Sequence, residues 1–333
     1  MLRYPTALLL ILALAGCMDS APHDNPFDPE SERYEDEGAV LGSVGGIYPS
    51  TPAREGVSVR VRPLGGGGIE RMTASNAMGE FMIDRVPKGE YVVMAEGEGL
   101  RTETDTVSVR AGQTARVDFR LDALPVILTQ NARTVHIEQW VQESSLFQLE
   151  VEAIVTDRDR ATDVNGVELV VDDIGFRIAL TQVAPGHYEG KFDAAQLPGG
   201  QVQAFLGRPL RIEVTDVNGN VGTGAPMTLV RVVEQTPLTA SPQGTETISD
   251  PSPTLVWRPA QIPFTFTYRV DLYQVDGAGI PRLLESESGI DASVTSYDVT
   301  RTLGEGNYYW TVWIVDAAGN RSRSKEAGFS VVL

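Results

Sequence analysis

Side chains that commonly act as nucleophiles, general bases or zinc ligands are scarce, because the 333 residues include one cysteine and three histidines. His136 and His187 have neither His-x-x-x-His spacing nor a cysteine nearby, so we expect no zinc site. No Gly-x-Ser-x-Gly motif marks a nucleophilic serine. Carboxylates are numerous, but nothing in the sequence selects one pair for acid–base catalysis. We therefore predict a protein that is not an enzyme and uses no cofactor.

Carboxylates in one polar loop could bind a cation. Asp157, Asp159 and Asp163 lie close together, and oxygen ligands at this density could hold calcium. A solvated turn without an ion is the alternative, and we favour it. The run at 216–220, Asp-Val-Asn-Gly-Asn, imitates the first ligand positions of an EF-hand loop, but Val221 occupies the position that requires glycine.

Alternation of apolar and polar residues with a period of two predicts β-strands along almost the whole chain after residue 38. The alternation is clear at 57–61, 117–121, 147–153 and 308–314. No stretch keeps a period of 3.6, and 33 glycines and 20 prolines interrupt the strands. We expect an all-β fold of three consecutive antiparallel β-sandwiches, with a helical turn or two.

The amino terminus carries an apolar run at 7–15 that begins soon after Arg3 and is too short to span a bilayer. Leu14-Ala15-Gly16-Cys17 ends this run and resembles the lipobox of bacterial lipoproteins. The resemblance implies that residues 1–16 are a signal peptide and that Cys17 is acylated, with palmitate among its lipids. As the only cysteine, Cys17 cannot form an internal disulfide, and the alternative is a free or intermolecular thiol.

Residues 17–37 follow the signal peptide and combine the acylated cysteine with prolines and a run of acidic side chains. They contain too little apolar surface to fold, so we expect a disordered tether. The formal net charge of the chain is −18, which disfavours nucleic acid and anionic headgroups as partners. Met18 stands where an aspartate would retain enterobacterial lipoproteins in the inner membrane. We therefore expect a lipid anchor in the outer membrane of a bacterial cell envelope.

Proline-containing joints at Pro125 and Pro237 divide the remaining chain into units at 38–124, 125–235 and 236–333. Proline cannot continue a strand ladder, and each unit has the size of a β-sandwich. We expect each unit to fold alone.

Motifs in the first unit indicate tight turns that lead into buried strands. In the segments at 76–81 and 86–91, a glycine precedes a buried aromatic residue, Phe81 or Tyr91. Together with the opening Gly-Ala-Val-Leu-Gly at 38–42, they make this unit resemble the carboxypeptidase regulatory-like domain, a transthyretin-like sandwich with a carbohydrate-binding-like fold. The resemblance implies an appendage without catalytic residues.

Motifs in the other two units are similar to those of modular surface proteins. Leu255-Val256-Trp257, and Tyr308 as a corner tyrosine, make the third unit resemble a fibronectin type III domain. The middle unit is similar to bacterial immunoglobulin-like domains, because the hairpin motif at 216–220 recurs at 316–320.

Aromatic residues of the third unit form a second candidate site. Tyr309 and Trp313 alternate with apolar residues that should face the core, and Tyr273 should face outward on its own strand. The fibronectin resemblance makes these strands neighbours, so the three rings could stack on a sugar or a partner protein. We favour the alternative, in which they form cross-strand aromatic pairs or pack against the middle unit.

Together these observations favour a lipid-anchored, non-enzymatic cell-envelope protein with a role in adhesion, scaffolding or accessory binding. One alternative is a carbohydrate-binding surface module that uses the first unit and the aromatic rings. Another is an accessory subunit of an exported hydrolase or transporter. The partners expected are the membrane, through the lipid, and a glycan or another envelope protein, with no nucleic acid.

Overall fold

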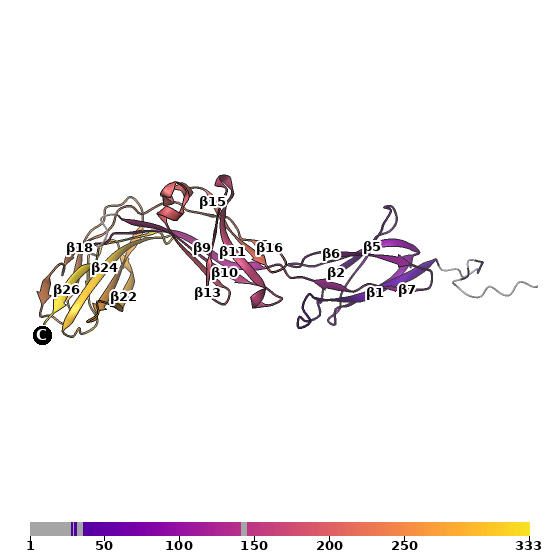
Figure 1. Ribbon diagram of the computed structural model, residues 1–333, viewed down its shortest axis with the longest axis horizontal. Coiled ribbons are helices and arrows are strands. Elements are labelled where there is room, and N and C mark those ends of the chain that lie inside the picture. The colour runs from indigo at the N-terminus through magenta and orange to yellow at the C-terminus, as the bar shows by residue number, and fades with distance from the viewer. Residues whose placement is uncertain (1–27, 29, 32–35, 141–144) are drawn as a thin grey trace, which may run out of the picture. The chain divides into compact units, whose positions relative to one another are not determined.

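The structure, a computed structural model, describes residues 28, 30, 31, 36–140 and 145–333. Its regular secondary structure is almost entirely β-strand, so the all-β prediction is confirmed (Figure 1). The lipobox, Cys17 and most of the predicted tether lie outside the described residues. Within the described part of the chain, no helix is long and apolar enough to cross a membrane. The chain divides into two compact units, Met1–Asp122 and Ala123–Leu333.

The first unit is a sandwich of two four-stranded sheets. One sheet contains β1 (Glu37–Gly46), β4 (Glu80–Pro87), β7 (Thr114–Arg116) and β8 (Phe119–Leu121). The other contains β2 (Ser58–Pro63), β3 (Arg71–Ala74), β5 (Gly89–Glu96) and β6 (Glu103–Val109). The predicted alternation is visible in β2, where Val59 and Val61 are buried and Arg60 between them is not. Both sheets contribute such side chains to one apolar core.

A glycine turn fixes the entry to β4, as the sequence predicted. Gly79 has a φ of +78°, and a Cβ at this position would lie 2.3 Å from the carbonyl oxygen of Val44. Only glycine fits there without displacing the backbone. The turn delivers Phe81 to the core, where its ring centroid lies 6.4 Å from that of Phe119.

The second unit begins with a sandwich whose first sheet is ordered β13-β14-β10-β9. These strands are β9 (Val126–Ile137), β10 (Leu146–Thr156), β13 (Thr181–Ala184) and β14 (His187–Asp193). The facing sheet contains β11 (Val164–Val171), β12 (Phe176–Ala179), β15 (Pro209–Asp216), β16 (Val221–Thr223) and β17 (Met227–Thr228). Short 3₁₀ turns connect them: η1 (Ala161–Asp163), η2 (Asp172–Ile174), η3 (Ala194–Gln196), η4 (Pro198–Gly200) and η5 (Val202–Phe205).

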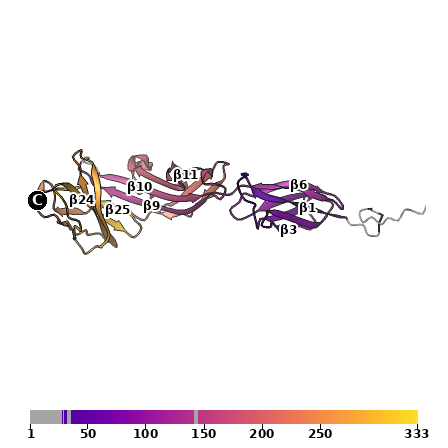
Figure 2. The ribbon, with the colours of Figure 1, turned by 90° about the horizontal axis from the view of Figure 1, so that it is seen from below.

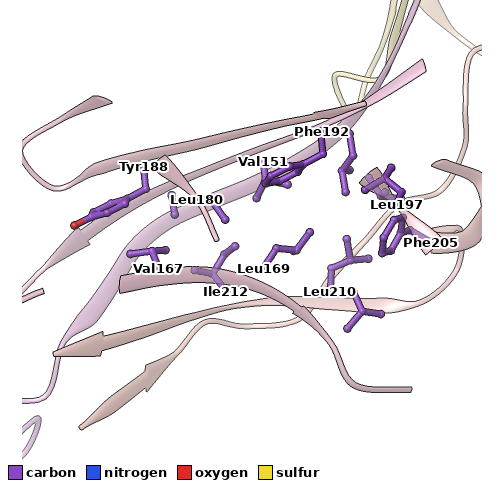
Figure 3. Close-up of a cluster of buried hydrophobic side chains, with 14 of the residues drawn as sticks. Val151, Val167, Leu169, Leu180, Tyr188, Phe192, Leu197, Phe205, Leu210 and Ile212 are labelled. Carbon is purple, nitrogen blue, oxygen red and sulfur yellow. The ribbon is translucent and has the colours of Figure 1, made fainter. Parts of the chain in front are cut away.

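The core of this sandwich lies between its two sheets. Figure 3 shows Val151 and Phe192 of one sheet facing Leu169 and Ile212 of the other. Phe205 of η5 is fully buried at one end of the same cluster and covers it. The outward-facing polar residues of β10 and β15 alternate with these buried ones, which is the pattern that the period of two predicted.

A second sandwich completes this unit and has its own core. Its larger layer contains β19 (Glu246–Ile248), β21 (Phe266–Val275), β22 (Pro281–Asp291), β24 (Gly306–Asp316), β25 (Arg321–Arg323) and β26 (Ala327–Val331). The smaller layer contains β18 (Leu238–Ser241), β20 (Thr254–Arg258) and β23 (Ser296–Asp298). Trp257 and Tyr268 meet edge to face in the core at 5.3 Å. The Tyr308 hydroxyl donates to the Gly304 carbonyl at 2.9 Å, which closes the corner before β24.

The two sandwiches of the second unit share one ten-stranded sheet (Figure 2). β25 pairs in parallel with β9, with Arg321 opposite Val135 and Arg323 opposite Ile137. The predicted boundary between 235 and 236 therefore lies inside one compact unit, although each side has a separate core. The boundary predicted after 124 lies two residues past the division at Asp122. Independent folding of the segments 125–235 and 236–333 stays a prediction.

Side chains reinforce the junction between the sandwiches. The buried Glu150 of β10 accepts hydrogen bonds from Arg133 Nε at 2.7 Å and from Arg321 Nη2 at 2.6 and 2.7 Å. Thr134 N donates to Asn320 Oδ1 at 2.9 Å, and both residues are buried. The Arg321–Glu150 and Thr134–Asn320 contacts thus connect segments that are 171 and 186 residues apart in the sequence.

Candidate functional site

The three aromatic residues predicted as a surface site lie on one sheet, and none of them is fully exposed. Tyr273 and Tyr309 are directly opposite in the β21–β24 ladder and stack with centroids 4.7 Å apart and planes 13° from parallel. This contact is the cross-strand aromatic pair that we expected as the alternative to a binding patch. Burial raises the pKa of both tyrosine hydroxyls, so they are neutral donors at physiological pH.

Trp313 lies farther along β24 and packs against the junction. Its ring centroid lies 5.3 Å from the Arg321 guanidinium, 5.9 Å from that of Arg323 and 6.0 Å from that of Arg269. Its Nε1–H donates to Asp271 Oδ2 at 2.9 Å. A ring held in this way stabilises the sheet and offers little surface to a ligand, so Trp313 does not join the two tyrosines in one exposed patch.

A different tryptophan, which the sequence analysis did not single out, is the exposed one. Trp140 follows β9 and is 68% exposed. Its Nε1–H donates to the carbonyl oxygen of Glu326 at 2.5 Å, which fixes the ring beside the turn between β25 and β26. The ammonium of Lys325 lies 4.6 Å from the ring centroid. Trp140 stands in no alternating segment, so periodicity could not reveal it; the one available signal was a tryptophan within a polar stretch.

Two adjoining pockets meet at this ring, and we call them together the Trp140 groove. Both are lined by Trp140, Thr239 and Gln243, and their volumes are about 590 and 280 Å³. Tyr309 and Glu326 line the larger pocket. Tyr309 thus belongs to both the predicted site and the groove, with Tyr273 stacked behind it.

The chemistry of the groove favours a ligand with apolar and hydroxyl surfaces. An indole ring held at its edge offers a flat apolar surface, while Thr239, Gln243 and Glu326 offer hydroxyl, amide and carboxylate groups. A groove of this composition can bind a sugar by stacking and hydrogen bonding together. No group in it is arranged as a nucleophile beside a general base.

The two histidines within the described residues make structural contacts. The His136 ring is buried, stacks on Phe147 at 4.1 Å and places Nδ1 3.2 Å from the Val233 carbonyl oxygen. His187 Nε2 lies 2.9 Å from a Glu152 carboxylate oxygen, and Glu189 completes a half-buried cluster on the sheet. His23 and the predicted lipid-bearing Cys17 lie outside the described residues.

The aspartates of the predicted calcium loop follow β10 and lead into η1. Asp157 and Asp163 are buried, and Asp159 is half-buried. The hairpin at 216–220 satisfies its own aspartate, because Asp216 Oδ1 accepts hydrogen bonds from the backbone amides of Asn218 and Asn220. The resemblance of this run to an EF-hand loop is therefore explained by the residues that form the hairpin turn.

A family model matches one part of the chain. Residues 47–122 match the model of the carboxypeptidase regulatory-like domain, which confirms that resemblance for the first unit. No curated protein matches the chain.

Several solved structures are similar to the chain at low identity. The TIE protein of Bacillus anthracis is 10% identical with a TM-score of 0.27, and the match covers 89% of this chain and 49% of that one. BcpA, the major pilin subunit of Bacillus cereus, is 10% identical with a TM-score of 0.29, covering 89% and 95%. The fibronectin(III)-like modules of Clostridium thermocellum CbhA are 16% identical with a TM-score of 0.30, covering 63% and 94%. Residues 47–122 therefore match the carboxypeptidase regulatory-like domain, and further β-sandwiches follow them in the chain.

Proposed function

We propose that this chain is a lipid-anchored binding protein of the bacterial cell envelope and that it binds a neutral glycan in the Trp140 groove. The observation that carries the proposal is the ring of Trp140, 68% exposed at the meeting point of two pockets. An exposed tryptophan beside a concave polar surface is costly to leave in water and is typical of a binding site.

The charged side chains of the groove and the net charge of the chain indicate which class of glycan can bind. Glu326 lies in the larger pocket and Glu138 in the smaller one, while Lys325 contributes one positive charge beside Trp140. The formal net charge of −18 opposes the approach of a polyanion. A neutral saccharide meets no such barrier, and its hydroxyls can pair with the carboxylates and with the amide of Gln243.

Replacing Trp140 with alanine should lower affinity for a neutral glycan about tenfold, because a lost ring contact of about 1.4 kcal/mol changes a dissociation constant by that factor. The unacylated chain at 18–333 would first be applied to a glycan array. Binding of the selected saccharide would then be titrated by calorimetry for the wild type and for Trp140→Ala. Trp140→Phe should keep part of the affinity, since it keeps an apolar ring.

Val183→Ala is the matched control, since Val183 is an exposed apolar residue of β13 that does not line the groove. It should bind the glycan as the wild type does. Equal affinities of Trp140→Ala and Val183→Ala would place the site elsewhere. Binding of extended peptides, with no neutral glycan retained, would refute the proposed ligand class.

The anchor is proposed from Leu14-Ala15-Gly16-Cys17. In cells fed labelled palmitate, Cys17→Ser should carry no label and should accumulate as the uncleaved precursor, because acylation needs the cysteine thiol. The wild-type chain should be labelled and should sediment with outer-membrane markers. Palmitate labelling of Cys17→Ser at the wild-type level would show that the lipid is not attached to this residue.

A further inference from the structure

The Trp140 groove is built from both sandwiches of the second unit. Glu138 and Trp140 follow β9, which belongs to the first sandwich. The residues that face them belong to the second sandwich, on β18, on β24 and in the turns after β18 and β25: Thr239, Gln243, Tyr309, Lys325 and Glu326. Neither sandwich alone therefore contains the groove.

Hydrogen bonds that continue the pairing of β9 with β25 hold the two walls of the groove together. Beyond the paired residues Ile137 and Arg323, the Glu138 amide donates to the Arg323 carbonyl at 3.2 Å. Arg323 Nη2 donates in return to the Glu138 carbonyl, also at 3.2 Å. Two residues farther on, the Trp140 ring donates to the Glu326 carbonyl. The walls thus meet only where β9 and β25 are paired.

The junction can open without exposing either apolar core. Each sandwich has its own cluster of buried side chains, and among the described residues the two clusters share none. The contacts across the junction include the pairing of the three residues of β25 and polar contacts such as Glu150 with Arg321 and Thr134 with Asn320. An opening that breaks such contacts and leaves the cores intact costs less free energy than global unfolding.

We infer that glycan binding in the Trp140 groove and the pairing of β9 with β25 stabilise each other. The inference rests on the proposed function, because it needs a ligand in this groove. A saccharide that stacks on Trp140 and pairs with Gln243 contacts both sandwiches at once, so it binds the paired state and not the open one. Linkage is reciprocal, so the bound saccharide must then favour pairing as much as pairing favours binding.

Amide hydrogen exchange of the unacylated chain at 18–333 would measure opening of the junction. The amides of Thr134 and Glu138 both donate across it. With the saccharide selected on the glycan array at about ten times its dissociation constant, both amides should exchange about tenfold more slowly. The Ser75 amide, which donates to the Val57 carbonyl in the first unit, is the internal control and should exchange at an unchanged rate.

Trp140→Ala tests the role of the ring at the junction without any saccharide. This variant lacks the donor to the Glu326 carbonyl, so the Glu138 amide should exchange about fivefold faster than in the wild type, the effect of losing one hydrogen bond. The same saccharide concentration should slow its exchange only about twofold, because a tenfold weaker affinity leaves half of the sites filled. Val183→Ala should match the wild type in both measurements, since Val183 lies on β13 and does not line the groove.

The possible failures are distinguishable. Calorimetric binding of the saccharide with unchanged exchange at Thr134 and Glu138 would overturn the coupling and leave the proposed function intact. A chain that binds no saccharide would give no heat, and both proposals would then fail. Unchanged exchange of the Glu138 amide in saccharide-free Trp140→Ala would also overturn the coupling, because contact between the ring and Glu326 would then be independent of strand pairing.

Discussion

Replacing Trp310 with alanine should lower the free energy of unfolding by about 3–5 kcal/mol, the usual cost of truncating a large buried aromatic side chain. Trp310 is 0% exposed in the core of the second sandwich, and its Nε1–H donates to the Pro242 carbonyl at 2.8 Å. The alanine variant would leave a cavity and a buried carbonyl oxygen without its donor. Urea denaturation followed by circular dichroism would measure the loss as a lower midpoint.

A comparison of Trp313→Ala with Trp310→Ala shows how much packing on the outer face of β24 contributes to stability relative to packing in the core. Trp313 is half-buried, and the Asp271 carboxylate that its ring binds keeps hydrogen bonds from Arg269 Nε at 2.9 Å and Ser286 Oγ at 2.7 Å. We expect a loss of about 1–3 kcal/mol, the cost of one missing donor to a buried charged group. A loss equal to that of Trp310→Ala would mean that the arginine-covered face stabilises the sheet as strongly as the core does.

Strands and cores could be predicted because their causes are local. The alternation at 57–61 and 308–314 places every second side chain on one face, and that face is buried in β2 and in β24. Gly79 could be predicted because a tight turn before Phe81 requires positive φ. In each case the information lies within a few residues of the element that it determines.

The junction and the groove could not be predicted, because both depend on pairing between distant segments. β25 has three residues, and nothing in them indicates that β9 will be the neighbouring strand. That pairing brings Trp140 beside Glu326, so a residue that follows β9 lines a groove with residues from the end of the chain. Polar Thr311 and Asp271 are also buried on the face expected to be solvated.

Replacing Glu150 with alanine should lower the free energy of unfolding by about 3–5 kcal/mol, because it leaves buried positive charge unpaired. Glu150 is 7% exposed and compensates both Arg133 and Arg321. Burial lowers the pKa of Arg321, and the negative charge of Glu150 raises it. The Glu150 carboxylate thus offsets part of the cost of burying a charged guanidinium. Glu150→Gln should cost less, because the amide oxygen still accepts a hydrogen bond.

The site at which Glu150→Ala loses stability shows whether the junction between the two sandwiches is weakened or the whole unit is destabilised. Amide hydrogen exchange should become faster first along the β9–β25 ladder, since Arg321 belongs to β25 and Arg133 to β9. Glu168→Ala is the control, because its side chain is 40% exposed and its partner Arg177 is 48% exposed. Exposed pairs contribute about 0–1 kcal/mol. If Glu150→Ala costs no more than Glu168→Ala, strand pairing rather than the ion-pair cluster joins the two sandwiches, and the segments 125–235 and 236–333 should separate only when that pairing is broken.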